Sequence, residues 1–326
     1  MTQTARVCVV IPSCRRAELL ERCLSALRTQ TLPPQHVDIV VCDDGPDDAT
    51  RAVVAAQQRL APNGLHIQYL PVTETQGPAG ARNRGWQWAQ APIIAFTDDD
   101  TIPDAQWLEQ GLAAMVLGVD AVSGRVIVPL PDAPSDLELD AAGLADAEFV
   151  TANCFVRREV LHALGGFDER FTMAWREDSD LHFRLLEAGC VVTRAPAAQV
   201  VHPVRPMPFA AGLRMQKKVL FDVLLYAKHP QMYRRQIRRD PPWFYLWVSG
   251  LVVLGLLLLA LGAWHAAAVV FTLWVLATLW FFIKRQRRVS MTARNAAELL
   301  LTSALIPPLS IFWRFVGIRR FGVRFP

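Results

Sequence analysis

The sequence predicts an α/β domain built on a parallel sheet, followed by α-helices that cross a membrane. Through residues 6–96, short apolar stretches alternate with segments of helical periodicity, which is the pattern of repeated β-α units. Residues 243–283 then form two uncharged stretches of about 20 residues each, long enough to span a bilayer as helices. The charge divides in the same way, because residues 1–204 carry 16 Arg and 27 Asp and Glu, whereas residues 205–326 carry 18 Lys and Arg and 3 acids.

The elements of the first domain can be placed in order along the chain. Helices are expected at residues 17–29, 48–60 and 80–89, and strands at 6–12, 37–42, 66–70, 92–96 and 198–201. In sheets of this kind ligands bind beyond the carboxyl ends of the strands. Carboxylates follow two of these strands, as Asp43-Asp44 and as Asp98-Asp99-Asp100, so we expect both groups at one edge of the sheet.

Composition excludes several classes of protein. A net charge of −11 over residues 1–204 would repel phosphates, so a nucleic-acid binder is not expected. The six Cys include no C-x-x-C pair, which excludes a zinc ribbon or a thioredoxin motif and favours a reducing cytosol. The first residues contain no long apolar stretch, so no secretory signal is expected. The net charge of +15 over residues 205–326 instead favours an anionic membrane surface as a partner.

The apolar region predicts a helical hairpin. Residues 243–263 and 264–283 would each cross the membrane, with a tight turn at Gly262; the alternative is one helix of 41 residues, which is too long for one bilayer. Basic residues flank both ends of the region and none lies in the turn. The positive-inside rule therefore places both flanks, the catalytic domain and the C-terminus in the cytosol.

The rest of the chain is divided around this hairpin. We expect a catalytic domain over residues 1–208, a basic juxtamembrane helical segment over 209–242 and a basic tail over 284–326. Within the tail, residues 299–315 are apolar but interrupted by two prolines, which favours an interfacial or re-entrant helix over a spanning one. Residues 129–148 are rich in Pro and acids and are expected to form a mobile loop.

The acidic triplet is the first candidate for chemistry. Three adjacent carboxylates repel one another unless a cation neutralises them. Side chains alternate along an extended chain, so Asp98 and Asp100 project to the same side and can hold a hard divalent ion. The alternative is a solvated acidic turn, which the preceding apolar strand at residues 93–96 makes less favourable.

Four other positions carry candidate chemistry, each beside a purely structural interpretation. Asp43 and Asp44 can accept hydrogen bonds from a nucleobase or ribose, although the acids that follow them would also cap a helix. Arg82, in a Gly-rich helix start, offers a planar donor fork to a base or diphosphate. Asp178, of the Glu177-Asp178 pair, can take a proton from an acceptor hydroxyl or serve as a helix cap. His202 can serve as a third metal ligand or can simply be a polar residue at the end of a strand. The full set of candidate residues is Asp43, Asp44, Arg82, Asp98, Asp99, Asp100, Glu177, Asp178 and His202.

Taken in order, these segments resemble the inverting glycosyltransferases of family 2, which have the GT-A fold. The resemblance covers roughly residues 5–205 and rests on the ordered segments VVIPSCRR, VVCDDGPDD, GPAGARNRG, IIAFTDDDTIPD, GGFDERF, WREDSDL and VVHP. It implies a Rossmann-like domain that binds a nucleotide-diphosphate-sugar.

The resemblance also implies roles for the candidate residues. Asp44 would contact the nucleobase with Asp43 nearby, and Arg82 would help hold the nucleotide. Asp98 would lie toward the ribose or sugar and Asp100 on a Mn²⁺ or Mg²⁺ ion, with Asp99 between them at the donor site. His202 matches a position that often completes the metal site. Asp178 would be the general base, with Glu177 beside it.

One departure from the family bears on the product. The Gln-x-x-Arg-Trp motif of processive synthases is absent, because Gln216 is followed by Lys217-Lys218-Val219-Leu220. The expected activity is therefore transfer of a single sugar, with inversion, to a hydroxyl acceptor in cell-surface polysaccharide or glycolipid synthesis. The membrane segments favour a lipid-linked or glycolipid acceptor.

Two other functions remain as alternatives. A nucleotidyltransferase also uses a nucleotide, a metal and paired Asp residues, but residues 12–16 lack the glycines, and residues 1–204 lack the Lys, that such an enzyme usually needs. A catalytically inactive membrane scaffold related to glycosyltransferases would have no need of free carboxylates at one edge of the sheet.

Overall fold

The computed structural model describes residues 5–205, 207–287 and 289–323. They form two compact units. Among these residues, the first unit contains 5–129 and 142–203, and the second contains 130–141 and those from 204 to 323. The second unit thus begins close to the expected end of the catalytic domain at residue 208, and it also takes a segment from inside that domain.

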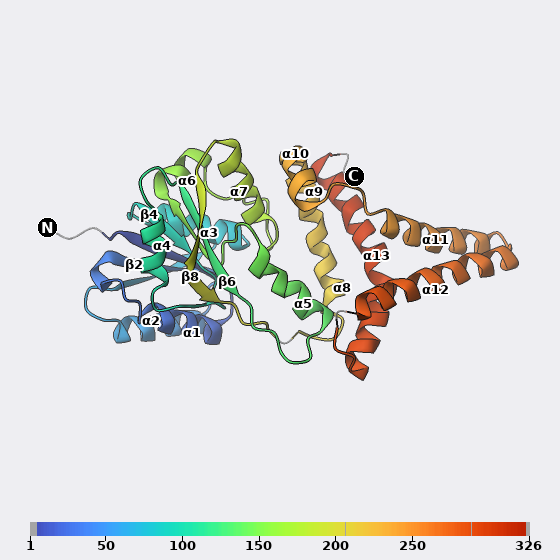
Figure 1. Cartoon of the computed structure of the whole chain (residues 1–326), viewed down its shortest axis with the longest axis horizontal. Coiled ribbons are helices and arrows are strands. Elements are labelled where there is room, and N and C mark those ends of the chain that lie inside the picture. The colour runs from blue at the N-terminus through green and yellow to red at the C-terminus, as the bar shows by residue number, and fades with distance from the viewer. Residues whose placement is uncertain (1–4, 206, 288, 324–326) are drawn as a thin grey trace. The chain divides into compact units, whose positions relative to one another are not determined.

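The first unit is built on an eight-stranded sheet (Figure 1), with the strand order β3-β2-β1-β4-β7-β6-β8-β5. The strands are β1 (Val7–Ser13), β2 (Val37–Asp44), β3 (His66–Val72), β4 (Ile93–Phe96), β5 (Ile102–Pro103), β6 (Ala121–Ile127), β7 (Cys154–Arg157) and β8 (Val192–Val201). The helices are α1 (Ala17–Leu27), α2 (Asp48–Leu60), α3 (Pro78–Trp88), α4 (Trp107–Ala114), α6 (Arg158–Leu164) and α7 (Glu177–Glu187). Short 3-10 turns lie at η1 (Pro34–His36) and η2 (Gly143–Asp146).

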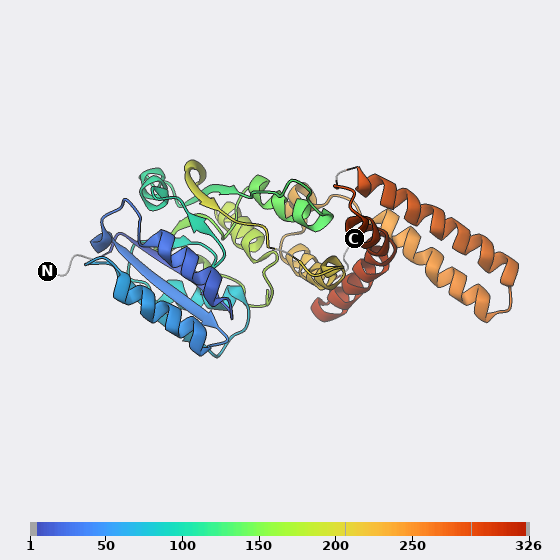
Figure 2. The same cartoon turned by 90° about the horizontal axis from the view of Figure 1, so that it is seen from below.

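Alternation along the strands creates two apolar layers. On β1, Val7, Val9 and Ile11 pack with α1, α2 and α4, whereas Cys8 and Val10 pack with α3, α6 and α7. Figures 1 and 2 show the sheet between these two sets of helices. Strands buried on both faces read as continuous apolar stretches rather than alternating ones, which is why the sequence of β1 and β2 is so uniformly apolar.

The expectation of a parallel sheet is correct for only part of the molecule. Strands β3, β2, β1 and β4 are parallel, but β7 runs antiparallel to both β4 and β6, and β5 runs antiparallel to β8. The apolar pattern of a buried strand is the same in either direction, so the sequence did not reveal the reversal. The sheet is therefore mixed.

The second unit is helical. Its helices are α5 (Asp136–Ala142), α8 (Ala211–Met215), α9 (Val219–Lys228), α10 (Pro230–Met232), α11 (Trp243–Ala260), α12 (Trp264–Gln286) and α13 (Ala293–Phe321), with a 3-10 turn at η3 (Gln216–Lys218) and a π-helical turn at η4 (Tyr233–Ile237). The last residue of α5, Ala142, falls in the first unit. Helices α11 and α12 lie side by side as a hairpin in Figure 2.

The helical hairpin is confirmed, and a single 41-residue helix is excluded. Helix α11 ends at Ala260, α12 begins at Trp264, and Gly262 takes a φ of 74° in the turn between them. Glycine adopts that left-handed conformation without a steric penalty. Three helices, α11, α12 and α13, are long and apolar enough to cross a membrane.

Two segments differ from expectation. Residues 129–148 do not form an irregular loop throughout, because they contain α5 and η2. At the start of α5, the side chains of Ser135 and Glu138 each accept a hydrogen bond from the other residue's backbone N–H, which is the reciprocal cap that starts a helix.

Helix α13 continues through Pro307 and Pro308 and is longer than the expected 299–315. Prolines are tolerated in apolar helices where neighbouring groups satisfy the freed carbonyls.

Candidate active site

Strand register brings the candidate carboxylates to one edge of the sheet, as expected. Ser13, the last residue of β1, pairs with Asp43 of β2. On the other side of β1, the Thr97 N–H that follows β4 donates to the Val10 carbonyl at 3.4 Å. The acidic triplet that begins at Asp98 therefore starts at the carboxyl end of β4, beside the carboxyl ends of β1 and β2.

Asp98, Asp100 and His202 converge on one point. Their candidate ligand atoms all lie within 4.8 Å of one another, and His202 Nε2 lies 3.4 Å from Asp100 Oδ1. Strands β5 and β8 pair antiparallel, with Ile102 opposite Val201. His202, which follows β8, therefore lies near Asp98 and Asp100, which precede β5. Two carboxylates and an imidazole are a suitable donor set for a divalent ion such as Mn²⁺, so the three residues fit the implied metal.

Asp99 points to a different set of partners. Its carboxylate accepts hydrogen bonds from Ser13 Oγ at 2.9 Å and from Arg16 Nη1 at 2.9 Å, and its side chain is only 2% exposed. Burial raises the pKa of Asp99 to about 6, against the opposing effect of the Arg16 charge. The alternation expected along the triplet is therefore present, with Asp98 and Asp100 on the cluster and Asp99 turned to the protein.

Asp43 and Asp44 lie at the end of β2 and have different surroundings. Asp43 is fully buried and accepts from the Tyr69 hydroxyl at 2.8 Å and from the Asp47 N–H at 3.2 Å. Asp44 is partly exposed and accepts from the Gly77 N–H at 2.7 Å. Burial raises the pKa of both carboxyls. Only Asp44 combines this position with solvent access, which is consistent with the nucleobase contact predicted for it.

Arg82 joins two of the candidate carboxylates. Its Nη2 lies 2.7 Å from Asp98 Oδ1 and its Nη1 lies 3.1 Å from Glu177 Oε1. The guanidinium is 2% exposed and stands 5.8 Å from the centroid of the Phe167 ring. Helix α3 thus links Asp98 to the start of α7 through two ion pairs of one buried guanidinium.

The Glu177-Asp178 pair begins α7. Glu177 is 3% exposed, and burial together with the charge of Asp178 raises its pKa. Asp178 is partly exposed, and its Oδ1 accepts from the Ser179 N–H at 2.6 Å; burial also raises its pKa. The residue before the pair, Arg176, has a φ of 76°, a left-handed conformation that is uncommon away from glycine and concentrates at functional sites.

Sequence reasoning missed two contributors to this edge. Ser13 and Arg16 both bond Asp99, and Arg16 Nη1 also lies 3.4 Å from Asp100 Oδ2. The available signal was their position directly after the first strand, at the same edge as the acids. Their pairing with a particular carboxylate depends on the β1–β4 contact, which the local sequence does not show.

The fold and this edge of the sheet define a class of protein, the GT-A-like nucleotide-diphospho-sugar transferases. The sequence model described as "Glycosyl transferase family group 2" matches residues 93–284, and that of "Glycosyl transferase family 2" matches residues 8–139. The chain belongs to glycosyltransferase family 2. This confirms the resemblance drawn from the sequence motifs.

Curated relatives agree with this assignment. Glycosyltransferase AglE of Haloferax volcanii is 32% identical over 225 residues, covering 65% of this chain and 71% of that protein. Validoxylamine A glucosyltransferase of Streptomyces hygroscopicus subsp. limoneus is 31% identical over 225 residues, covering 57% of this chain but only 49% of the relative. The beta-1,3-glucosyltransferase WfgD of Escherichia coli is 31% identical over 110 residues, covering 34% of this chain and 41% of WfgD.

Among solved structures, the mannosyltransferase PcManGT of Pyrobaculum calidifontis, in complex with GDP-Man and Mn²⁺, shares the fold. It superposes with a TM-score of 0.57 at 22% identity, covering 98% of this chain and 87% of that one. The likeness therefore extends through the C-terminal helices as well as the sheet domain.

Proposed function

We propose that this protein is a membrane-anchored, metal-dependent, inverting glycosyltransferase. It would move one sugar from a nucleotide-diphosphate-sugar to a hydroxyl of a lipid-linked acceptor, in the synthesis of cell-surface polysaccharide or glycolipid. The observation that carries the proposal is the convergence of Asp98, Asp100 and His202 within 4.8 Å. Arg82 links this cluster to Glu177, the neighbour of the candidate base.

The donor side of the reaction uses the residues at the ends of β2 and β4. Asp44 would accept a hydrogen bond from the nucleobase, and Asp98 would lie toward the ribose or the sugar. Asp98, Asp100 and His202 would hold the divalent ion. When bound, such an ion neutralises the diphosphate and stabilises the departing nucleotide.

The acceptor side uses Asp178. Its carboxylate would remove the proton from the acceptor hydroxyl as the hydroxyl oxygen forms a bond to the anomeric carbon. The bond to the diphosphate breaks on the opposite side of the sugar, so the configuration at that carbon is inverted. A base must be ionised to act, so the raised pKa of Asp178 predicts that the rate falls as the pH decreases.

A lipid-linked acceptor is supported by the helical unit. Three helices are candidates to cross a membrane, and the net charge of +15 over residues 205–326 would hold that unit on anionic lipid. The name of WfgD describes glucosyl transfer to an N-acetylglucosaminyl-diphosphoundecaprenol. The missing Gln-x-x-Arg-Trp motif supports addition of one sugar rather than polymer synthesis.

Release of nucleoside diphosphate from a panel of nucleotide-sugars tests the proposal. Membranes containing the wild type should release it from one donor in the presence of Mn²⁺ or Mg²⁺. Asp178→Asn should reduce transfer by about 10²–10⁴-fold, the usual contribution of a positioned acid or base. Asp100→Ala should also reduce transfer, because it removes one of the groups that would hold the ion. Asp178→Asn should retain nucleotide binding, whereas Asp100→Ala should weaken metal-dependent binding.

A control in α7 separates loss of chemistry from loss of structure. Ser179→Ala removes a hydroxyl that lies 3.3 Å from Asp178 Oδ1 but leaves the backbone N–H bond to that carboxylate intact. This variant should keep most of the activity. Unchanged turnover in Asp100→Ala would contradict the role of Asp100 in holding the ion. No release from any donor by the wild type would instead support the inactive membrane scaffold.

A further inference from the structure

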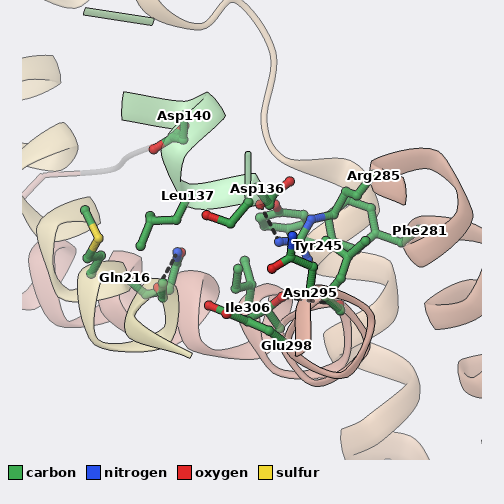
Figure 3. Close-up of a pocket in the computed structure, with 15 residues that line it drawn as sticks. Asp136, Leu137, Asp140, Gln216, Tyr245, Phe281, Arg285, Asn295, Glu298 and Ile306 are labelled. Atoms are coloured by element: carbon green, nitrogen blue, oxygen red, sulfur yellow. Dashed lines mark hydrogen bonds and ion pairs between the residues drawn. The ribbon is translucent and has the colours of Figure 1, made fainter. Parts of the chain in front are cut away.

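A cavity of about 220 Å³ lies within the helical unit, and its lining includes none of the residues assigned to the transfer reaction. Figure 3 shows α5 above it, with Asp136 and Leu137 directed toward it, and α13 below it. Gln216 closes one side, and Tyr245, Phe281 and Arg285 form the opposite side. All of its lining residues belong to the same compact unit.

The cavity is located at the polar ends of the apolar helices. Tyr245 is in the first turn of α11, Arg285 is in the last turn of α12, and Asn295 and Glu298 are in the first turns of α13. The turn of the hairpin, at Gly262, is at the other end of α11 and α12. In a membrane, this position corresponds to the level of the lipid head groups, where aromatic and charged side chains accumulate.

Hydrogen bonds already hold the lining side chains in place. Arg285 donates to Asp136 Oδ2 at 2.6 Å and to Ser303 Oγ at 2.9 Å. The Asn295 amide donates to the Ser290 carbonyl at 2.9 Å, and Glu298 Oε1 accepts from the Ala210 N–H at 3.1 Å. Carboxylates, amides and guanidinium groups each offer more hydrogen-bonding positions than these contacts use. The cavity is therefore pre-organised, with both donors and acceptors remaining.

The charge and size of the cavity limit what it can hold. Its lining includes three carboxylates, those of Asp136, Asp140 and Glu298, and one guanidinium that is already paired. The charge of nearby Lys218 also acts on Asp140, which leaves the carboxylates in excess by one. An excess of carboxylates opposes a phosphate. Its volume is roughly seven times the ~30 Å³ share of one water molecule, so it is also much larger than an ammonium group requires.

Hydroxyl groups match the lining better, because each hydroxyl both donates and accepts. The rings of Tyr245 and Phe281, which meet edge to face at 5.8 Å between centroids, add apolar surface for the C–H face of a sugar ring. We propose that this cavity binds the neutral saccharide head group of a membrane glycolipid. The inference rests on the proposed function and specifies the class of lipid that the helical unit of this enzyme recognises: a lipid that already carries a sugar, rather than a bare polyprenyl phosphate.

A glycine in the cavity wall allows it to be filled without strain. A Cβ added at Gly212 meets no atom within 4 Å, and Gly212 lines the cavity from helix α8. Gly212→Leu should therefore occupy the space while keeping the helix. Gly250→Leu is the matched control, because Gly250 is also helical, has no atom within 4 Å of an added Cβ, and does not line the cavity.

Lipid binding to the full-length protein can be measured by native mass spectrometry from phosphatidylglycerol nanodiscs. The probes are glucosyl-, galactosyl- and N-acetylglucosaminyl-diacylglycerol, unglycosylated diacylglycerol, and undecaprenyl phosphate. At least one glycosyl lipid should bind about tenfold more tightly than diacylglycerol, equivalent to ~1.4 kcal/mol. Gly212→Leu should abolish this preference, and Gly250→Leu should retain it.

Three results would overturn the inference. They are undecaprenyl phosphate binding as well as the best glycosyl lipid, no glycosyl lipid exceeding diacylglycerol, and equal effects of the two leucine variants. The assay needs no nucleotide-sugar or turnover. Failure of the transferase proposal would instead appear as no release of nucleoside diphosphate from any donor by the wild type, so the two failures are distinguishable.

Discussion

At the scale of single residues, the neighbouring carboxylates of Glu177 and Asp178 have different surroundings. Glu177 is buried against Arg82, whereas Asp178 is partly exposed and is held by the start of its own helix. A base must reach its substrate, so exposure favours Asp178 for proton transfer. Glu177 instead joins α7 to Asp98 through Arg82.

The buried state of Glu177 predicts a dependence of stability on pH. Burial raises its folded pKa above the ordinary value of 4.5, so the folded protein retains a proton that the unfolded chain has lost. As the pH rises from about 4.5 through the folded pKa, the free energy of unfolding of the wild type should therefore decrease relative to that of Glu177→Gln, so the wild type becomes less stable. Denaturation of the metal-free proteins at several pH values measures this difference.

The control for this measurement is an exposed acid of the same unit. Glu21→Gln, in α1 and exposed to solvent, should not reproduce this dependence, because no burial acts on its carboxylate. A constant difference between wild type and Glu177→Gln over the whole range would contradict the burial argument. If the stability of the wild type instead increased with pH relative to Glu177→Gln, the pKa of Glu177 would be lowered by folding rather than raised.

The sequence predicted the residues of this site better than their partners. Asp98, Asp100 and His202 were candidates because each follows an apolar strand, and the structure brings them together. The contact of Arg82 with Glu177 joins residues 95 positions apart, and it depends on how α3 and α7 pack on one face of the sheet. Such packing is a tertiary property that local periodicity does not contain, and the antiparallel direction of β7 was missed for the same reason.

At the scale of elements, α3 connects three parts of the candidate site. Its first turn is fixed where the Gly77 N–H donates to Asp44, and its interior supplies Arg82 to Asp98 and Glu177. Gly77 has φ 97° and ψ 163°, a conformation that is essentially restricted to glycine. An added Cβ there would lie 2.5 Å from the Thr172 carbonyl oxygen.

Gly77→Ala should therefore destabilise the first unit and misplace α3. Backbone strain of this kind costs of order 1–3 kcal/mol, and the close contact with Thr172 adds to it, so we expect a loss of about 2 kcal/mol or more. Chemical denaturation measures it. Gly143→Ala is the control, since Gly143 has no positive φ and no atom within 4 Å of an added Cβ; it should change stability by less than ~0.5 kcal/mol. Equal losses in both variants would contradict this account of α3.

At the scale of the whole molecule, membrane topology depends on α13. In α11 and in α12, 17% of an apolar stretch of 18 residues is buried by the rest of the protein, whereas in α13 the buried share of such a stretch is 39%. Gly317 of α13 packs closely on α9, where an added Cβ would lie 2.7 Å from Val223 Cγ2. Helix α9 has 10 residues and is thus about 15 Å long, too short for a hydrocarbon core of about 30 Å. We therefore expect the part of α13 that packs on α9 to lie at the membrane surface.

We therefore expect α13 to lie at the interface and both its ends to be cytosolic, as the basic flanks of the hairpin also favour. The test is a membrane-impermeant maleimide and a single new cysteine at Ala263, Arg287 or Val323. The exposed Cys14 and the partly exposed Cys190 are first replaced with Ser. Arg287→Cys and Val323→Cys should react only in inverted vesicles, and Ala263→Cys only in right-side-out vesicles. If Val323→Cys instead reacts together with Ala263→Cys, α13 crosses the bilayer, since an odd number of spans puts the two ends of this unit on opposite sides.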